Sequence, residues 1–136
     1  MSLDDLIKIV LQQPIYGFFA LLIIAGIIGS FYAELYETKR IAFFHDAVRA
    51  IEYGNIDDLK ALLAQHPECI NASDRRKYWR LIHYAAAEGY IDMVDYLISQ
   101  GAEVNASSPH GTPLTCALKG NHMDVADLLR SCGAKE

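Results

Sequence analysis

The sequence lacks the residue patterns that mark several common classes of small protein. It has only three cysteines, Cys69, Cys116 and Cys132, without CxxC spacing or dense clustering. An odd and dispersed set argues against a disulfide framework and against a zinc site. It is typical of buried thiols in a reducing compartment. We therefore expect no metal and no other cofactor.

Catalytic motifs are missing as well. The sequence has no H-E-x-x-H, P-loop or G-x-S-x-G arrangement, and His45, His66, His110 and His122 are scattered. A chain of 136 residues is also too short for the two-lobed cleft of larger enzymes. These absences predict a protein that is not an enzyme.

An excess of basic charge is missing too. The chain has 12 basic and 17 acidic side chains, a net charge of −5. Because binding to nucleic-acid phosphates needs a basic face, this balance predicts no nucleic-acid partner.

Charge is absent altogether from Ile9 to Ala33. Within this stretch, residues 15–33 comprise fifteen apolar residues, three glycines and a serine, whereas the rest of the chain has ordinary globular composition. As a helix these residues span roughly 28 Å, close to the thickness of the hydrocarbon core of a bilayer. They predict a single transmembrane helix that contacts membrane lipid through residues 15–33.

The flanks of this segment favour a retained span over a cleaved signal peptide. The N-terminal MSLDDLIK is net negative, and Phe31-Tyr32-Ala33 lacks a small-x-small cleavage pattern. Aromatic residues collect at both ends of the span, as is typical of the headgroup level: Tyr16, Phe18, Phe19, Phe31, Tyr32 and Tyr36.

The segment before the span has two interpretations. Residues 1–13 place apolar side chains on one helical face, so they form either an interfacial helix that bends at Pro14 or an extension of the spanning helix. We expect a tail or interfacial helix at 1–13, and a transmembrane helix with a juxtamembrane extension at 14–40.

Two further features of the span bear on its surroundings. Lys8 precedes it, whereas Lys39, Arg40 and Arg49 follow, so the positive-inside rule predicts a cytoplasmic C-terminal part and an N-terminus outside. The small residues of the span allow close helix packing, either in self-association or against the helix of a partner: Ala25, Gly26, Gly29 and Ser30.

The rest of the chain is repetitive. CINASD recurs as EVNASS, with Asn71 and Asn105 34 positions apart, and three copies of a loop followed by an amphipathic helix align. A short helix with one small face precedes each loop. The pattern predicts a domain at 41–136 with repeats at about 41–73, 74–106 and 107–136.

This domain resembles the ankyrin repeat family. The middle copy, IHYAAAEGYIDMVDYLISQGAEVNA (82–106), is similar to nearly a full family repeat, and Gly111-Thr112-Pro113-Leu114 is similar to the family's turn. The resemblance implies an all-α fold, in which one N-terminal transmembrane helix precedes a short ankyrin-repeat solenoid of about three helix pairs. Ala85, Ala86 and Ala117 would then let helices approach closely, with Leu62, Leu97 and Leu128 behind them.

Departures from the family pattern affect the turns. The family pairs a turn threonine with a histidine, but the middle copy has Arg80 with His83, and the last copy has Thr112 with Thr115. We therefore expect His83 to be a structural histidine with a different partner. Asn121 stands where the family has a glycine and is expected in the left-handed conformation.

The turn between the first two repeats is basic and aromatic, with the sequence RRKYWR at 75–80. Residues 41–136 carry 9 basic and 13 acidic side chains, and without residues 74–80 the numbers are 5 and 12. Two interpretations follow. Either this turn contacts an acidic partner or anionic lipid, or Trp79 packs inward and the cations are merely solvated.

The concave face of an ankyrin stack supplies further candidates on the second turn and the inner helices. The complete set of expected partner-binding residues is Arg75, Arg76, Lys77, Tyr78, Trp79, Arg80, Tyr84, Glu88, Ser107, Ser108, His110 and Lys119.

These patterns together predict a membrane-tethered module that binds a protein, as an adaptor or scaffold at the membrane face. The alternatives are an accessory structural subunit that its transmembrane helix holds in a larger membrane complex, and an immunity-type neutraliser of a toxin.

Overall fold

The computed structural model describes residues 4–5 and 14–135, with side chains from Ala20 onward in the second range. The expected tail or interfacial helix at 1–13 lies almost entirely outside these residues. The described part is helical and contains no strand; Ser73 pairs with Arg80, and Ser108 with Gly111, as isolated bridges. The turns between the repeats are therefore closed by single bridges in the described residues, without β-hairpin strands.

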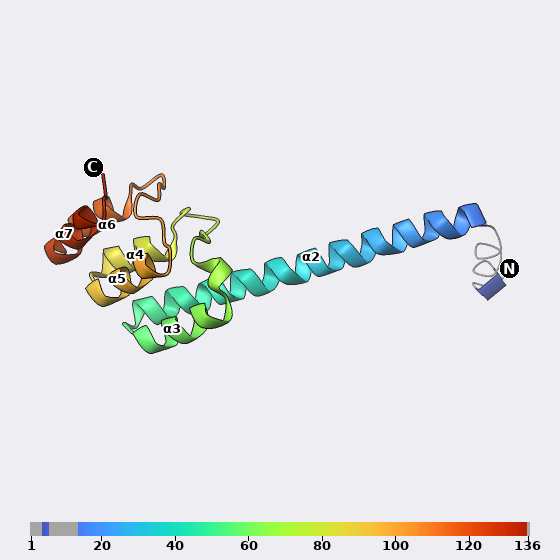
Figure 1. Cartoon of the computed structure of the whole chain (residues 1–136), viewed down its shortest axis with the longest axis horizontal. Coiled ribbons are helices and arrows are strands. Elements are labelled where there is room, and N and C mark those ends of the chain that lie inside the picture. The colour runs from blue at the N-terminus through green and yellow to red at the C-terminus, as the bar shows by residue number, and fades with distance from the viewer. Residues whose placement is uncertain (1–3, 6–13, 136) are drawn as a thin grey trace. The chain divides into compact units, whose positions relative to one another are not determined.

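Six α-helices follow one another in the described part of the chain (Figure 1). A 3₁₀ turn, η1 (Pro67–Cys69), follows the second of them. The helices are α2 (Pro14–Glu52), α3 (Ile56–Gln65), α4 (Leu81–Glu88), α5 (Ile91–Ser99), α6 (Pro113–Lys119) and α7 (Met123–Ser131).

The chain divides into two units, Met1–Lys39 and Arg40–Glu136. In the first unit, α2 exposes every side chain from Leu21 to Tyr36. The helix from Ala20 to Glu52 is long and apolar enough to cross a membrane, and none of its apolar window is buried. Among the described residues of this unit, the exposed aliphatic helix packs against no protein core.

The second unit begins inside α2, whereas its sequence pattern predicts a separate short helix, HDAVRAIEY. The helix is continuous because no glycine or proline interrupts the stretch from Phe31 to Tyr53. It ends at Glu52, two residues before Gly54, which has a φ of +68°. Glycine accepts this left-handed conformation without a steric cost.

The remaining helices stack in pairs. Helix α4 contacts α5 and α6, and α7 contacts α6 and α5. Ala85, Ala86 and Ala117 are fully buried, which confirms the close approach of these helices.

The leucine layer differs from the prediction at two of its three positions. Leu97 is fully buried, but Leu62 and Leu128 are only half-buried. In the first repeat the buried leucines are Leu59 and Leu63, three positions before and one position after Leu62. In the third repeat the buried leucine is Leu129, one position after Leu128. Adjacent positions of a helix point about 100° apart, so this small offset moves the inward stripe to a different leucine.

The turn between the paired helices needs a left-handed residue in each repeat. Gly89 has a φ of +80°, and Asn121 has a φ of +60°, as expected for asparagine in place of glycine. Gly89 has a second constraint, because a β-carbon there would collide with the imidazole of His122. That ring lies there because its Nε2 is 3.0 Å from the carbonyl oxygen of Ala87 in the preceding repeat.

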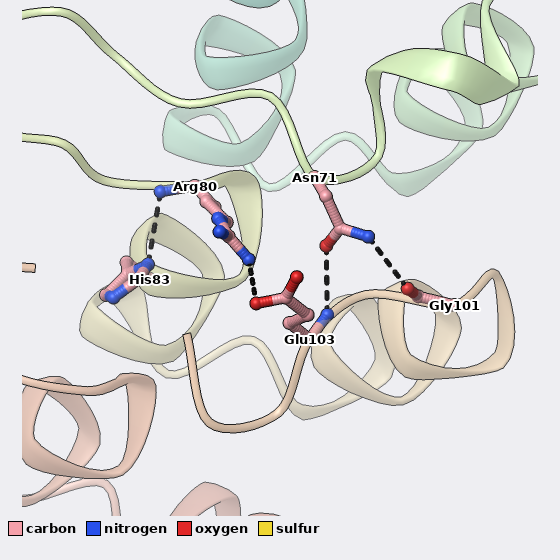
Figure 2. Close-up of polar contacts among 5 residues, drawn as sticks. All are labelled: Asn71, Arg80, His83, Gly101 and Glu103. Carbon is pink, nitrogen blue, oxygen red and sulfur yellow. Dashed lines mark hydrogen bonds and ion pairs between the residues drawn. The ribbon is translucent and has the colours of Figure 1, made fainter. Parts of the chain in front are cut away.

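The recurring asparagines join successive repeats. The Nδ2 of Asn71 donates to the carbonyl of Gly101 at 3.0 Å, and its Oδ1 accepts from the N–H of Glu103 at 2.9 Å (Figure 2). Asn105 makes the same pair of bonds with Gly133 at 3.0 Å and Lys135 at 2.8 Å. We call these two arrangements the asparagine clasps.

Candidate binding groove

The basic segment of the sequence forms a closed turn between η1 and α4. We call residues 74–80 the finger. The N–H of Asp74 donates to the carbonyl of Trp79 at 2.8 Å, and the N–H of Tyr78 donates to the carbonyl of Asp74 at 3.0 Å. The finger leaves the helical stack on the same side as the later loop at 104–112 (Figure 1).

Asp74 organises the finger from its base. Its carboxylate accepts from the N–H of Arg76 and, at 2.9 Å, from the hydroxyl of Tyr84 on α4. Burial acts to raise the pKa of Asp74, but these hydrogen bonds and the charge of Lys77 outweigh it and lower the pKa. Burial, together with the bond to Asp74, raises the pKa of Tyr84 above its ordinary value. Both groups therefore keep their usual charge at neutral pH.

Trp79 packs inward. It is half-buried against the core, with ring centroids 5.0 Å from Tyr84, 6.0 Å from His83 and 6.4 Å from His110. Lys77 covers this cluster, with its Nζ 5.1 Å from the Trp79 centroid and 5.8 Å from that of Tyr84. Trp79 therefore packs inward, as the second of the two interpretations predicts, while Arg75, Arg76 and Lys77 stay exposed at the surface.

Arg80 and His83 hold the finger to the stack. Arg80 forms an ion pair with Glu103 of the next loop, and its side chain is 25% exposed (Figure 2). The Nδ1 of the fully buried His83 accepts from the backbone N–H of Arg80 at 3.1 Å. The different partner of this histidine is thus a backbone N–H, which any residue except proline supplies at position 80. Burial lowers the pKa of His83, so the ring is neutral at pH 7.

Tyr78 is the exposed aromatic residue of the finger. Its side chain is 58% exposed, and its φ is +55°. A bulky residue in the left-handed region costs about 1–2 kcal/mol, which glycine avoids.

A groove of about 850 Å³ lies between the finger and the last three turns of α2. It brings together five of the expected partner-binding residues, Arg75, Arg76, Lys77, Tyr78 and Tyr84. We call it the finger groove. Its volume is in the range of about 300–1,000 Å³ that is typical of ligand sites. The opposite wall comes from α2 and was missed by the sequence analysis: Arg40, Ile41, Phe44, His45, Val48 and Glu52.

A signal for that wall is present in the sequence. Ile41, Phe44 and Val48 recur at spacings of three and four, which places them on one helical face. Phe44 is buried in the core, while Ile41 and Val48 are half-buried at the groove. This shorter pattern is hard to recognise, because the continuous apolar span at 15–33 lies just before it in the sequence.

A second, smaller cavity of about 380 Å³ holds three more of the expected residues, Trp79, His110 and Lys119. The Nζ of Lys119 donates to the carbonyl of His110 at 3.1 Å, which ties α6 to the second loop. The remaining expected residues line neither cavity. Glu88 and Ser107 are exposed, and the hydroxyl of Ser108 donates to the carbonyl of Gly111 at 2.7 Å.

Comparison with known families agrees with this architecture. A family model described as ankyrin repeats, in three copies, matches residues 44–136. The chain belongs to the ankyrin repeat family. Ankyrin repeats are generally a protein-interaction fold, so residues 44–136 form a protein-binding module.

Individual relatives match the ankyrin part of the chain. The potassium channel AKT1 of Arabidopsis thaliana is 36% identical over 87 residues, which is 63% of this chain and 10% of the channel. The NF-kappa-B inhibitor cactus of Drosophila melanogaster is 36% identical over 90 residues, or 62% of this chain and 18% of cactus. The rice E3 ubiquitin-protein ligase XB3 is 34% identical over 64% of this chain and 20% of the ligase. The chain thus spans a fifth or less of these relatives.

Proposed function

We propose that this protein is a membrane-tethered ankyrin module that binds a partner protein at the cytoplasmic face of a membrane. One observation carries the tether: the side chains from Leu21 to Tyr36 are apolar on nearly every face of α2, and all are exposed. In water such a helix exposes its whole apolar surface, whereas in lipid its apolar side chains gain a favourable environment.

Extraction of membranes with alkaline carbonate tests the tether. We expect the full chain to stay in the membrane pellet and Leu22→Asp/Ile27→Asp to move to the supernatant, because each central charge costs about 2.5–3.5 kcal/mol in a span. Tyr53→Asp is the matched control, since Tyr53 is 80% exposed in the second unit. Release of the wild-type chain by carbonate, or a mature N-terminus beyond residue 33, contradicts a retained span.

A native cysteine tests the orientation. Cys132 is exposed, whereas Cys69 and Cys116 are buried, and burial raises the pKa of both buried thiols. A membrane-impermeant maleimide reacts with the exposed thiolate first. We expect label on Cys132 only after the cells are permeabilised. Labelling in intact cells, lost in Cys132→Ser, places the repeats outside and contradicts a cytoplasmic module.

The second candidate is an accessory subunit that the span holds in a larger membrane complex, or in a copy of itself. Its support is the row of small residues: Gly26 and Gly29 have no atom near the position of a β-carbon, and Ala25 and Ser30 are also exposed. Such a face lets two helix backbones approach. Gly29→Ile should then release the protein from its complex on a native gel, while Ile28→Leu should not. If neither change alters the migration of the complex, the second candidate is wrong.

A further inference from the structure

The finger groove differs in charge from the rest of its unit. Four cations line it, Arg40, Arg75, Arg76 and Lys77, against two carboxylates, Glu52 and Asp74. The rest of residues 40–136 carries 6 basic and 11 acidic side chains. The groove is therefore a positive site on a negative body.

Both carboxylates offset part of this positive charge. The oxygens of Asp74 accept from the N–H of Arg76 and the hydroxyl of Tyr84, so this carboxylate already has partners inside the finger. Lys77 lies over the rings of Trp79 and Tyr84, which attract its ammonium without neutralising it. The four cations of the groove still outnumber its two carboxylates, and this net charge of +2 favours an anionic ligand.

The groove is also partly apolar. Ile41 and Val48 of α2 lie half-buried on one wall, and the exposed ring of Tyr78 lies on the other. Apolar walls between cations suit a ligand that presents an apolar side chain next to carboxylates. Aromatic residues and arginine are also the residue types most enriched at binding hot spots.

We infer that the finger groove binds an acidic segment of the partner protein, with an apolar side chain of that segment between Val48 and Tyr78. The inference rests on the proposed protein-binding function and names the chemistry of its partner. The net negative charge of the rest of the unit strengthens the selectivity, because it disfavours binding of an acidic segment outside the groove. A protein segment, rather than a lipid headgroup, matches a groove with two walls in a family that generally binds proteins.

Fluorescence anisotropy on the full chain in micelles of an uncharged detergent tests this inference. The probe is a fluorescein-labelled peptide rich in glutamate, with a central phenylalanine and leucine. Two matched peptides replace the glutamates by glutamine, or the two apolar residues by serine. We expect both replacements to weaken binding about tenfold or more, and the affinity for the acidic peptide to fall at higher ionic strength.

Variants of the chain locate the site. Arg76→Gln and Lys77→Gln should each weaken binding up to about fivefold, and Arg76→Glu should weaken it more because it repels the peptide. Lys60→Gln is the matched control, since Lys60 lies on α3 and lines neither cavity described above. Equal loss in Lys60→Gln, or no loss in the finger variants, overturns the inference.

Tyr78→Gly separates binding from folding. Glycine relieves the left-handed strain, so this variant should unfold at an unchanged or higher urea concentration while it binds the peptide less tightly. Retained affinity in this variant removes Tyr78 from the site and contradicts the two-walled binding mode.

A separate experiment tests the alternative that the finger groove binds anionic lipid headgroups. Peptide binding is repeated in nanodiscs of phosphatidylcholine with and without phosphatidylserine. We expect the peptide to bind in both, more weakly with phosphatidylserine because the anionic surface repels it, and the difference to shrink at higher ionic strength. If phosphatidylserine abolishes peptide binding even at an ionic strength that screens the charge of the membrane surface, the groove binds lipid headgroups and the inference is wrong. A partner that binds the repeats but is indifferent to Arg76→Glu leaves the proposed function intact and overturns only its acidic chemistry.

Discussion

Two loops of this protein occupy equivalent positions in successive repeats. They differ in length, in charge and in the residues that close them. Each begins one residue after a clasp asparagine, and each ends where the next inner helix starts. Nine positions separate Asn71 from Arg80, but seven separate Asn105 from Thr112. The extra length of the first loop lies in the finger.

The second loop is closed by small residues. Ser108 and Gly111 exchange two backbone hydrogen bonds at 3.1 Å each, and the hydroxyl of Thr112 accepts from the N–H of Thr115 at 3.3 Å. The finger instead encloses Asp74 and presents cations and Tyr78. In both repeats the residues at the ends of the loop hold the fold together through hydrogen bonds. Only the tip of the first loop carries a cluster of cations, which contrasts with the net negative charge of the rest of the domain.

Substitution of the clasp asparagines tests whether the ends of the two loops join successive repeats. Asn71→Ala removes two hydrogen bonds, to the carbonyl of Gly101 and from the N–H of Glu103, which should cost about 1–3 kcal/mol of unfolding free energy. Urea unfolding followed by the fluorescence of Trp79, the sole tryptophan, measures it.

The matched variants are Asn105→Ala, which should cost less because it joins only the last turn, and Asn71→Asp, which keeps the acceptor. An unchanged urea midpoint in Asn71→Ala means that the clasp does not join the repeats.

The glycine of the second loop gives the next largest effect. Gly111 has a φ of +115°, and a β-carbon there would collide with the side chain of Thr115. Gly111→Ala should therefore destabilise the domain by about 1–3 kcal/mol in the same assay. Tyr78→Gly in the finger should cost nothing. If the two changes have the same effect, the left-handed positions of the two loops are equivalent and the comparison fails.

Acid should act on the domain through the buried His83, which lies on the helix that follows the first loop. Because the folded pKa of His83 is lowered, its contribution to stability is complete above pH 6.5 and is lost as the pH falls below that value towards the folded pKa. The loss approaches about 1.4 kcal/mol per pH unit. His83→Thr, which copies the Thr115 of the second loop, should remove this part of the slope between pH 6.5 and 5. An identical slope in wild type and variant means that His83 is not the group responsible.

The ion pair between the loops should have the smallest effect. Arg80 and Glu103 are 25% and 59% exposed, so Arg80→Gln should cost only about 0.2–1 kcal/mol. High salt should reduce the difference between wild type and variant, which equilibrium unfolding at two salt concentrations measures. A cost that is large and independent of salt contradicts a simple exposed pair and assigns Arg80 to packing.

The sequence was sufficient to predict the repeats, because the spacing of apolar residues recurs in each copy and Asn71 and Asn105 are 34 positions apart. It was insufficient for the inward leucine of each helix, since Leu62 and Leu63 differ by only one position in an apolar stretch. The left-handed φ of Tyr78 has no local signal, because the turn is closed by Asp74 and Trp79.

Half of the finger groove was predictable from its cations and aromatic residues. The other half comes from α2, and its wall forms only when α2 and the finger are brought together by the fold. The spacing of Ile41, Phe44 and Val48 places them on one helical face, but it does not distinguish the wall of a groove from a buried face, since such spacing is ordinary on any amphipathic helix.

The most direct test of the account is photo-crosslinking in native membranes from the two loops in turn. A benzophenone side chain replaces either Tyr78 in the finger or His110 in the second loop, both of which are exposed. We predict an adduct with a partner protein from position 78 that Arg76→Glu abolishes, and a much weaker one from position 110. An adduct from position 110 alone, or equal adducts that Arg76→Glu does not affect, would contradict the finger as the binding element.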